Sequence, residues 1–210
     1  MSHLLVPILA FTAAAGVLTL TPGLDTAMIL RTATSGGARK GVAAALGISL
    51  GLFAWGVGAA FGLTALLMTS KLAFLVVKWV GAAYLLYLGV KLLAKPRKAL
   101  AMEAVEVGAR PQPNAFQRGF LSNILNPKVG VFYITFLPQF IPPGMNVAAF
   151  SILLTSIHVV LGLAWSAVLI SLTVPLGRFL QTPRVVRALD RLTGCVFVGF
   201  GLKLALTEHA

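Results

Sequence analysis

The sequence predicts an all-α integral membrane protein of six transmembrane helices, arranged as two inverted three-helix repeats in which helices 1 and 4 are broken. Three observations lead to this fold class. Hydrophobic residues fill 58% of the 210 positions and charged residues only 10%, unlike soluble domains, which are roughly half apolar and one quarter charged. Apolar runs of membrane length recur along the chain. Prolines interrupt the first and the fourth of these runs.

Six apolar runs are long enough to be membrane spans, since a helix needs about 20 residues to cross roughly 30 Å of hydrocarbon. From Val129 to Gly177 there is no Asp, Glu, Lys or Arg, and an IPPG segment divides this stretch in two. The sixth run is the least apolar because it contains Asp190 and Arg191, so a short buried helix is the alternative there. The runs are 4–33, 41–68, 72–93, 116–140, 147–175 and 187–206.

The predicted domain organisation is a first three-helix repeat at 1–94, a cytoplasmic linker at 95–114 and a second repeat at 115–210. The linker is charged and contains prolines, as exposed segments do. LGVKLL in the first repeat is similar to FGLKLA in the second, which aligns Gly89 with Gly201. Because each half has an odd number of spans, the second would enter the membrane from the opposite face, as in many secondary transporters.

The basic residues predict the orientation in the membrane. Three lie at or after the end of the first run, six lie around the linker and four lie at or before the start of the sixth run, so thirteen of the 17 fall on one side. By the positive-inside rule this side is cytoplasmic, and both termini are predicted outside. The thirteen are Arg31, Arg39, Lys40, Lys91, Lys95, Arg97, Lys98, Arg110, Arg118, Arg178, Arg184, Arg187 and Arg191.

Several function classes are excluded by composition and motifs. The net charge of +12 does not indicate nucleic-acid binding, because the basic residues stand between apolar runs rather than on one helix face. The single cysteine, Cys195, excludes an intramolecular disulfide and a cysteine-built metal site. Of three histidines two are terminal, so no enzyme constellation, metal site or cofactor is expected. The SGGARKG segment lacks the phosphate-loop spacing of an ATP-driven pump.

The two proline breaks, LTPG and LNPK, are predicted to reach the same depth. Pro22 lies nine residues before Arg31, and Pro127 lies nine residues after Arg118, so each is about 13 Å from the cytoplasmic edge. This is near the bilayer midplane. A proline has no N–H and frees a carbonyl, which then needs a partner from protein, water or a ligand. A kink that only serves helix packing is the alternative interpretation.

An ionisable residue follows each break, Asp25 after the first and Lys128 after the second. A charge in hydrocarbon costs at least about 2.5 kcal/mol, so both are expected to face the protein interior and to pair if they are close. The pair would be a structural salt bridge or would handle substrate or protons. His158 is a relay candidate or a structural hydrogen-bonding group. The candidate site residues are Thr21, Pro22, Gly23, Asp25, Asn126, Pro127 and Lys128.

Two further patterns carry no site assignment. Trp55, Trp79 and Trp165 are interpreted as interfacial anchors or lipid contacts. Small residues along one face of the second run indicate either close helix packing or a surface that slides during alternating access. These are Gly47, Gly51, Gly58 and Gly62.

Three segments together resemble a known family. They are TPGLD at 21–25, SGGARKGVAAALGISLG at 35–51 and NILNPKVGVFYITFLPQF at 123–140. The LysE/RhtB family of bacterial amino-acid exporters is similar: it has TPGP(N/D), then a glycine-rich stretch after a basic turn, then NPK leading to FLPQF. Leu24 departs from the pattern, which has a second proline there. Since the family accepts Asn or Asp at the position of Asp25, the resemblance does not make this carboxylate an obligatory proton carrier.

The resemblance implies a six-helix secondary transporter in the bacterial cytoplasmic (inner) membrane. It would export amino acids or close derivatives, as an antiporter driven by the proton motive force, so its partners would be substrate, protons and lipid. Homoserine, threonine, leucine-like and basic amino acids are all implied, and the sequence selects none. Half-helix N-termini would bind the substrate carboxylate, and Asp25 with the freed carbonyls its ammonium. A passive channel is the alternative, and a homo-oligomer stays open because packing glycines serve both intrachain and interchain contacts.

Overall fold

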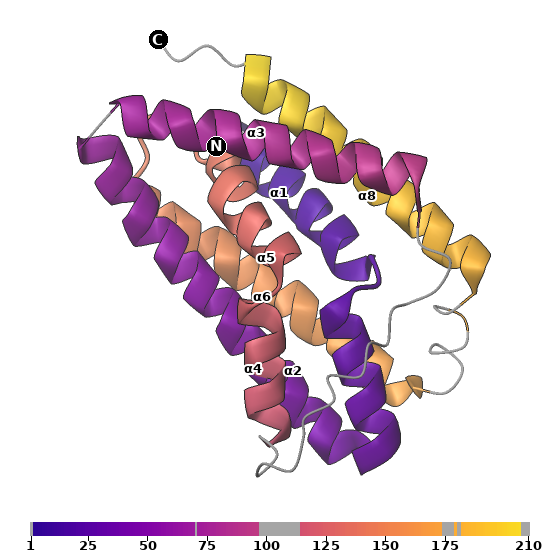
Figure 1. Cartoon of the computed structure of the whole chain (residues 1–210). Coiled ribbons are helices and arrows are strands. Elements are labelled where there is room, and N and C mark those ends of the chain that lie inside the picture. Colours follow the sequence, from indigo (N-terminus) through magenta and orange to yellow (C-terminus); the bar gives the residue numbers. More distant parts are fainter. Residues whose placement is uncertain (1, 70, 97–113, 174–178, 180–181, 207–210) are drawn as a thin grey trace.

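The computed structural model describes residues 2–69, 71–96, 114–173, 179 and 182–206, and every regular element in these ranges is a helix (Figure 1). By length and composition, two helices in this part of the chain are long and apolar enough to cross a membrane, at 24–62 and 147–171. Shorter apolar helices cover 4–20 and 79–94. The six-span count therefore stays a prediction. Most of the linker predicted at 95–114 lies outside the described residues.

The first half contains the predicted break. Helix α1 (Ser2–Leu20) ends before the proline, residues 21–23 are not helical, and α2 (Leu24–Thr69) begins directly after them. Gly37 divides α2 into two helical parts, because its φ of 77° lies in the left-handed region that favours glycine. This bend falls in the basic turn that the sequence places between the first two runs. α3 (Lys71–Ala94) follows.

The second half also has its break where the sequence predicts it. A capping box fixes the start of α4, in which Asn114 and Gln117 satisfy each other's backbone N–H groups at 2.9 and 3.1 Å. Residues 125–126 then interrupt the helix. The elements of this half are α4 (Ala115–Ile124), α5 (Pro127–Val131), the π-helix η1 (Phe132–Phe136), the 3₁₀-helix η2 (Leu137–Phe140), α6 (Val147–Ser171) and α8 (Pro183–Leu206).

Helices α3 and α8 lie side by side and run in opposite directions (Figure 1). A Cβ atom on Gly89 of α3 would lie 2.9 Å from the carbonyl oxygen of Gly194 in α8. A Cβ atom on Gly201 of α8 would lie 2.9 Å from Cγ of Leu86 in α3. The two glycines that the internal similarity aligns therefore both lie in this one interface.

Helices α2 and α4 also approach closely, because glycines remove the side chains between them. A Cβ atom on Gly47 would collide with the carbonyl oxygen of Phe116, and one on Gly51 would lie 2.6 Å from Oδ1 of Asn123. By contrast, Gly58 and Gly62 have nothing within 4 Å of an added Cβ. Helix packing thus accounts for the first two glycines of the predicted stripe and not for the last two.

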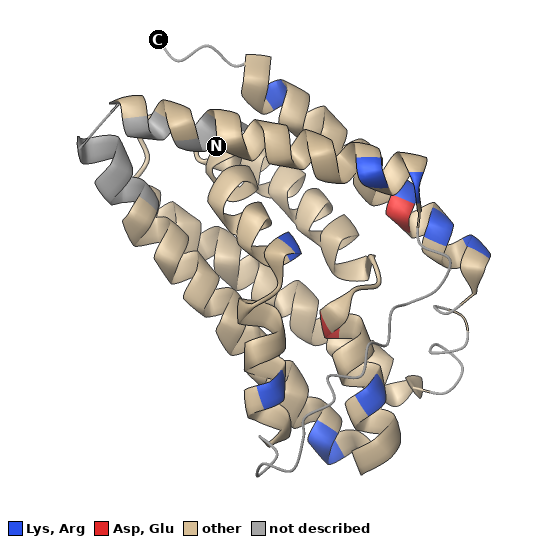
Figure 2. Ribbon diagram, viewed as in Figure 1, with Lys and Arg blue, Asp and Glu red and all other residues tan. Residues whose placement is uncertain are grey.

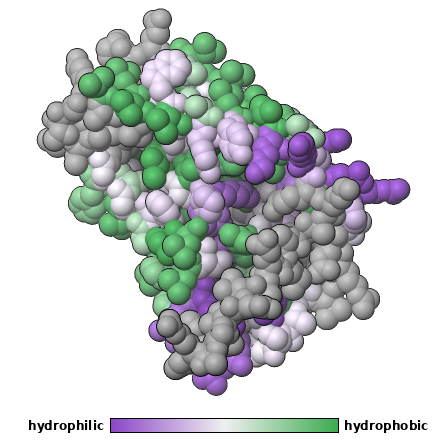
Figure 3. All heavy atoms as spheres, in the orientation of Figure 1, coloured by the Kyte–Doolittle hydropathy of each residue, from purple (hydrophilic) through white to green (hydrophobic). Residues whose placement is uncertain are grey.

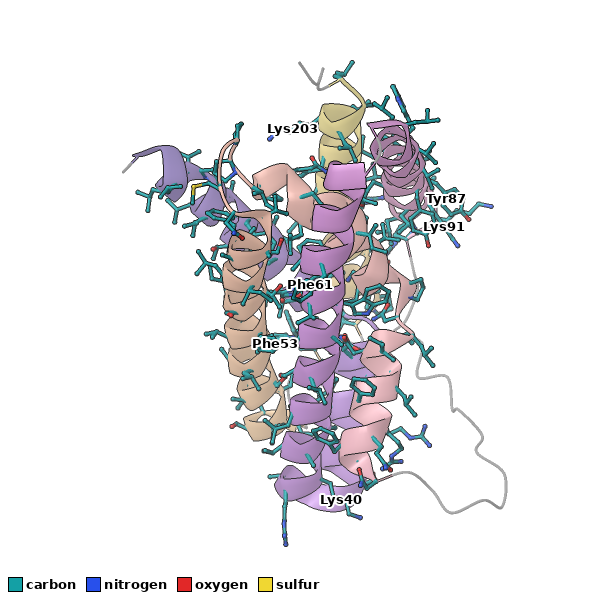
Figure 4. All side chains as sticks on the ribbon, turned by 90° about the vertical axis from the view of Figure 1, so that its left-hand side faces the viewer. Lys40, Phe53, Phe61, Tyr87, Lys91 and Lys203 are labelled. Atoms are coloured by element: carbon teal, nitrogen blue, oxygen red, sulfur yellow. The ribbon has the colours of Figure 1, made fainter. Side chains whose placement is uncertain are left out.

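The surface separates basic ends from apolar sides. Basic residues gather at the lower bend of α2, at the lower end of α4 and at the right-hand ends of α3 and α8 (Figure 2). Hydrophobic residues cover much of the upper and left-hand surface (Figure 3). Lys40 and Lys203 lie at opposite ends of the molecule, and Phe53 and Phe61 lie between them on α2, 36% and 68% exposed (Figure 4). An apolar side with basic ends is the pattern of a protein surrounded by lipid.

An aromatic cluster fills the core around η1. Phe132 stacks on Phe136 with ring centroids 4.9 Å apart, and Phe11 of α1 meets Phe140 of η2 edge-on at 5.5 Å. The cluster reaches α6, where the ring of His158 is 5.3 Å from Phe132. The aromatic cluster therefore holds η1 and η2 between α1 and α6.

Candidate functional site

A cavity of about 70 Å³ lies between the two helix breaks and α6. A single buried water needs about 10–15 Å³, so the cavity has room for several waters or a small polar group. Of the candidate residues, Pro22 and Pro127 do not line it. Those that do line it are Thr21, Gly23, Asp25, Asn126, Lys128 and His158. The structure thus brings together residues that are more than 100 positions apart in the sequence.

The first break leaves the carbonyl of Leu18 without its normal helical donor. That donor would be the N–H four residues later, and Pro22 has none. The ammonium of Lys128 takes its place, with Nζ donating to the Leu18 carbonyl oxygen at 3.4 Å. A side chain after the second break therefore satisfies a carbonyl freed by the first.

The second break starts a new helix with its own cap. Oδ1 of Asn126 accepts from the backbone N–H of Lys128 at 3.1 Å, and Pro127 occupies the first helical position. The carbonyl freed by Pro127 is that of Asn123, which accepts from the Asn126 N–H at 3.0 Å and from Nε1 of Trp55 at 3.4 Å. Both freed carbonyls thus have donors from the protein itself.

Asp25 brings a carboxylate to the cavity. Its Oδ2 accepts from Nδ2 of Asn123 at 2.8 Å, and Asn123 is completely buried. Its Oδ1 is also buried and has no hydrogen-bond partner among the described residues. Lys128 lies within electrostatic range of the carboxylate. Figure 2 shows the acidic position of α2 and the basic position of α5 in the interior of the view, away from the basic ends.

Thr21 ties the first break to α8. Its hydroxyl lies 2.6 Å from the carbonyl oxygen of Val17, to which it donates, and forms a second hydrogen bond with the hydroxyl of Thr193. Both threonines are buried. The contact fixes the end of α1 against α8, next to the cavity.

His158 reaches the cavity from α6 and is also bound inside the core. Its Nδ1 is 3.1 Å from the hydroxyl of Tyr133, and both side chains are buried. The ring arrangement fits a structural role, while the place at the cavity wall fits a relay. Within the described residues, His158 belongs to no group of three or more His, Cys, Asp or Glu side chains suited to a metal ion.

Sequence reasoning missed several residues of this region, among them the cavity-lining Thr19, Thr26 and Ser166. Asn123 holds Asp25, and a second asparagine one helical turn before Asn126 was the available signal. Trp165 and Trp55, interpreted as interfacial anchors or lipid contacts without a site, also have contacts here: Trp165 lines the cavity, and Trp55 donates to the carbonyl of Asn123. A tryptophan within an apolar run has no local signal that tells an inner from an outer face. Trp79, 54% exposed, agrees with the interpretation.

The comparisons with known proteins decide the family. A sequence model of the LysE type translocators matches residues 17–208. The chain belongs to this family. The resemblance found in its motif segments is therefore confirmed, and the family is one of membrane transporters rather than enzymes.

Relatives of this LysE type translocator match along nearly its whole length. It is 33% identical over 207 residues to the uncharacterized membrane protein YrhP of Bacillus subtilis (strain 168), covering 95% of this chain and 99% of the relative. It is 33% identical over 196 residues to a leucine efflux protein of Enterobacter sp. (strain 638), covering 89% of each. A homoserine/homoserine lactone efflux protein of Salmonella typhimurium is 30% identical over 195 residues, covering 92% and 93%. No solved structure matches the translocator.

Proposed function

We propose that this LysE type translocator exports amino acids or close derivatives from the cytoplasm, and that the cavity between the two breaks is its substrate site. The observation that carries the proposal is that polar residues from both breaks line one cavity. The relatives named for leucine and homoserine efflux support the substrate class. The candidate residues act in two groups. Asp25 and Lys128 bind the substrate, and Pro22 and Pro127 interrupt the helical backbone around it.

The charges of the cavity suit a zwitterion. An α-amino acid has one ammonium and one carboxylate, and the cavity has one carboxylate, Asp25, beside one ammonium, Lys128. The unpaired Oδ1 of Asp25 is an acceptor for the substrate ammonium. The start of α2, where Gly23 and Asp25 line the cavity, adds the partial positive charge of a helix N-terminus. The rest of the wall is mostly apolar and suits a small neutral side chain. Its apolar residues are Leu18, Ile29, Ile48, Leu52, Val129 and Leu169.

The proposal includes the architecture predicted from the sequence. Six spans in the bacterial inner membrane would form two inverted repeats with both termini outside. Two breaks at matching positions and the shared α3–α8 interface of Gly89 and Gly201 support this symmetry. Rocking of one repeat against the other would expose the cavity alternately to each side. Export would be coupled to protons entering the cell, with Asp25 or His158 as the proton-carrying group.

Counterflow in proteoliposomes tests the proposal. Vesicles containing the purified protein are preloaded with unlabelled L-leucine, L-homoserine, L-threonine or L-lysine, and uptake of the same labelled amino acid is measured. We expect at least one of them to be taken up faster into loaded than into empty vesicles, and an imposed pH gradient to drive its accumulation. Uptake that is independent of the internal amino acid would indicate a passive channel. If uptake of all four amino acids is the same in vesicles with and without the protein, the proposed function is contradicted.

A further inference from the structure

Three cavity-lining side chains have a buried polar atom that lacks a hydrogen-bond partner among the described residues. These atoms are Oγ1 of Thr19, Oδ1 of Asp25 and Nε1 of Trp165. More than about 90% of buried polar groups in folded proteins are paired, so three unpaired atoms around one cavity need an explanation. A ligand that enters the cavity and pairs with them provides it.

The atoms specify what the ligand carries. The indole N–H of Trp165 can only donate, and the carboxylate oxygen of Asp25 can only accept. A ligand that pairs with both atoms needs an acceptor for the Trp165 N–H and a donor for the Asp25 oxygen. An α-amino acid has both on one carbon, because its carboxylate accepts and its ammonium donates. We propose that the indole N–H of Trp165 binds the carboxylate of the transported amino acid, with the hydroxyl of Thr19 as a second donor. This inference rests on the proposed function.

Several other donors at the cavity already have an acceptor within the protein. Nζ of Lys128 donates to the Leu18 carbonyl, and the backbone N–H of Lys128 is bound by Oδ1 of Asn126. The hydroxyl of Ser166 donates to the carbonyl of Gly162 at 2.6 Å. The indole N–H of Trp165, by contrast, has no acceptor among the described residues and is a directional donor. Because indole is neutral, it selects a carboxylate without adding a second cation, and the cavity keeps the charge balance that suits a zwitterion.

The test compares an amino acid with its carboxamide as competitors of counterflow. The probe is the amino acid that the wild-type protein exchanges best in the panel above. Trp165→Phe keeps an aromatic ring and removes the N–H donor together with the second ring of the indole. We expect wild type to prefer the amino acid over the carboxamide, and Trp165→Phe to reduce this preference about tenfold, the effect of one hydrogen bond to a charged group. Trp79→Phe is the matched control, because Trp79 lies exposed on α3.

Two results would overturn the inference: a preference in Trp165→Phe within twofold of wild type, or the same loss in Trp79→Phe. A second measurement uses wild-type protein and so does not depend on whether Trp165→Phe folds. In wild-type protein labelled with 5-fluorotryptophan, the ¹⁹F resonance of Trp165 should shift when the amino acid is added and not when its decarboxylated amine is added. Equal shifts with both compounds would contradict a carboxylate contact.

The proposed function and the assignment of Trp165 can fail separately. If wild type exchanges no amino acid, the proposed function fails and this inference fails with it. If wild type exchanges an amino acid and Trp165→Phe retains the preference for the carboxylate, only the assignment of Trp165 is wrong.

Discussion

At each break, a carbonyl freed by proline is bound by a side chain from a distant part of the chain. Lys128 donates to Leu18, which is 110 positions earlier, and Trp55 donates to Asn123, which is 68 positions later. In an aqueous loop such carbonyls would be hydrated. In a membrane they need protein, water or ligand partners. At each break, the other half of the chain supplies a hydrogen-bond donor for the freed carbonyl. The prolines thereby connect the two halves at the cavity.

Replacing Pro22 tests this connection. Pro22→Ala supplies an N–H that can donate to the Leu18 carbonyl, so α1 can extend and compete with Lys128 for this acceptor. We expect amino-acid exchange per inserted protein to fall about tenfold, as for one lost hydrogen bond to a charged group. Pro7→Ala, also within α1 and away from the cavity wall, should exchange normally. Normal exchange by Pro22→Ala at normal abundance would favour a packing kink.

Single and double substitutions separate a structural role of Asp25 and Lys128 from a working one. Removing one partner of a buried charge pair can cost about 3–5 kcal/mol, so Asp25→Asn and Lys128→Gln should each lower the amount of folded protein. We expect the double variant to recover abundance and to lack accumulation driven by an imposed pH gradient. Wild-type accumulation by the double variant, normalised to protein amount, would reduce the pair to a structural salt bridge.

The residues that sequence reasoning places correctly at the cavity are those with a local signal. A charge or proline inside an apolar run is costly enough to indicate an inner face, which identifies Asp25, Lys128 and the residues beside the prolines. Trp165 has no such signal, and Asn123 has only the weaker one of an asparagine one turn before Asn126, because their place depends on which side of a helix meets another helix. The hydropathy of a run depends on its residue composition and does not show which face of the helix packs inward.

At the scale of elements, glycine contacts decide how close α2 and α4 come. Gly47→Ala would drive a methyl group into the Phe116 carbonyl, and the helices must separate to accept it. We expect a loss of about 1–3 kcal/mol, seen as a lower thermal unfolding temperature in detergent. Gly58→Ala is the control on the same helix, since its Cβ meets open space and alanine favours a helix. Equal stability of both variants would mean that α2 and α4 pack less closely than described.

The helix boundaries were largely predictable, but the geometry between 132 and 140 was not. The proline breaks and the bend at Gly37 follow from residues that cannot continue a helix. The change to a π-helix and then to a 3₁₀-helix has a subtler cause. Pro138 offers no N–H to the carbonyl of Ile134, so the helix cannot keep its regular bonding there.

At the scale of the whole molecule, the basic residues predict the orientation in the membrane. Single thiols introduced in a Cys195→Ala background test it, because Cys195 is the sole native cysteine. Ser35→Cys, exposed at the bend of α2, should react with an impermeant reagent only after the cytoplasmic side is opened. Met145→Cys, 38% exposed before α6, should react in intact cells. The reverse pattern would invert the orientation and the direction assigned to transport.

The central claim is that the cavity between the two breaks holds the transported amino acid. Gly162 lines this cavity, and a Cβ there would have only Leu52 as a neighbour, at 3.6 Å, so Gly162→Cys in the Cys195→Ala background introduces a thiol without a clash. Its rate of modification by a small methanethiosulfonate reagent should fall about tenfold when the exchanged amino acid is present at about ten times its dissociation constant. Ser35→Cys should react at an unchanged rate. An unchanged rate at Gly162→Cys, in protein that still exchanges the amino acid, would contradict the account.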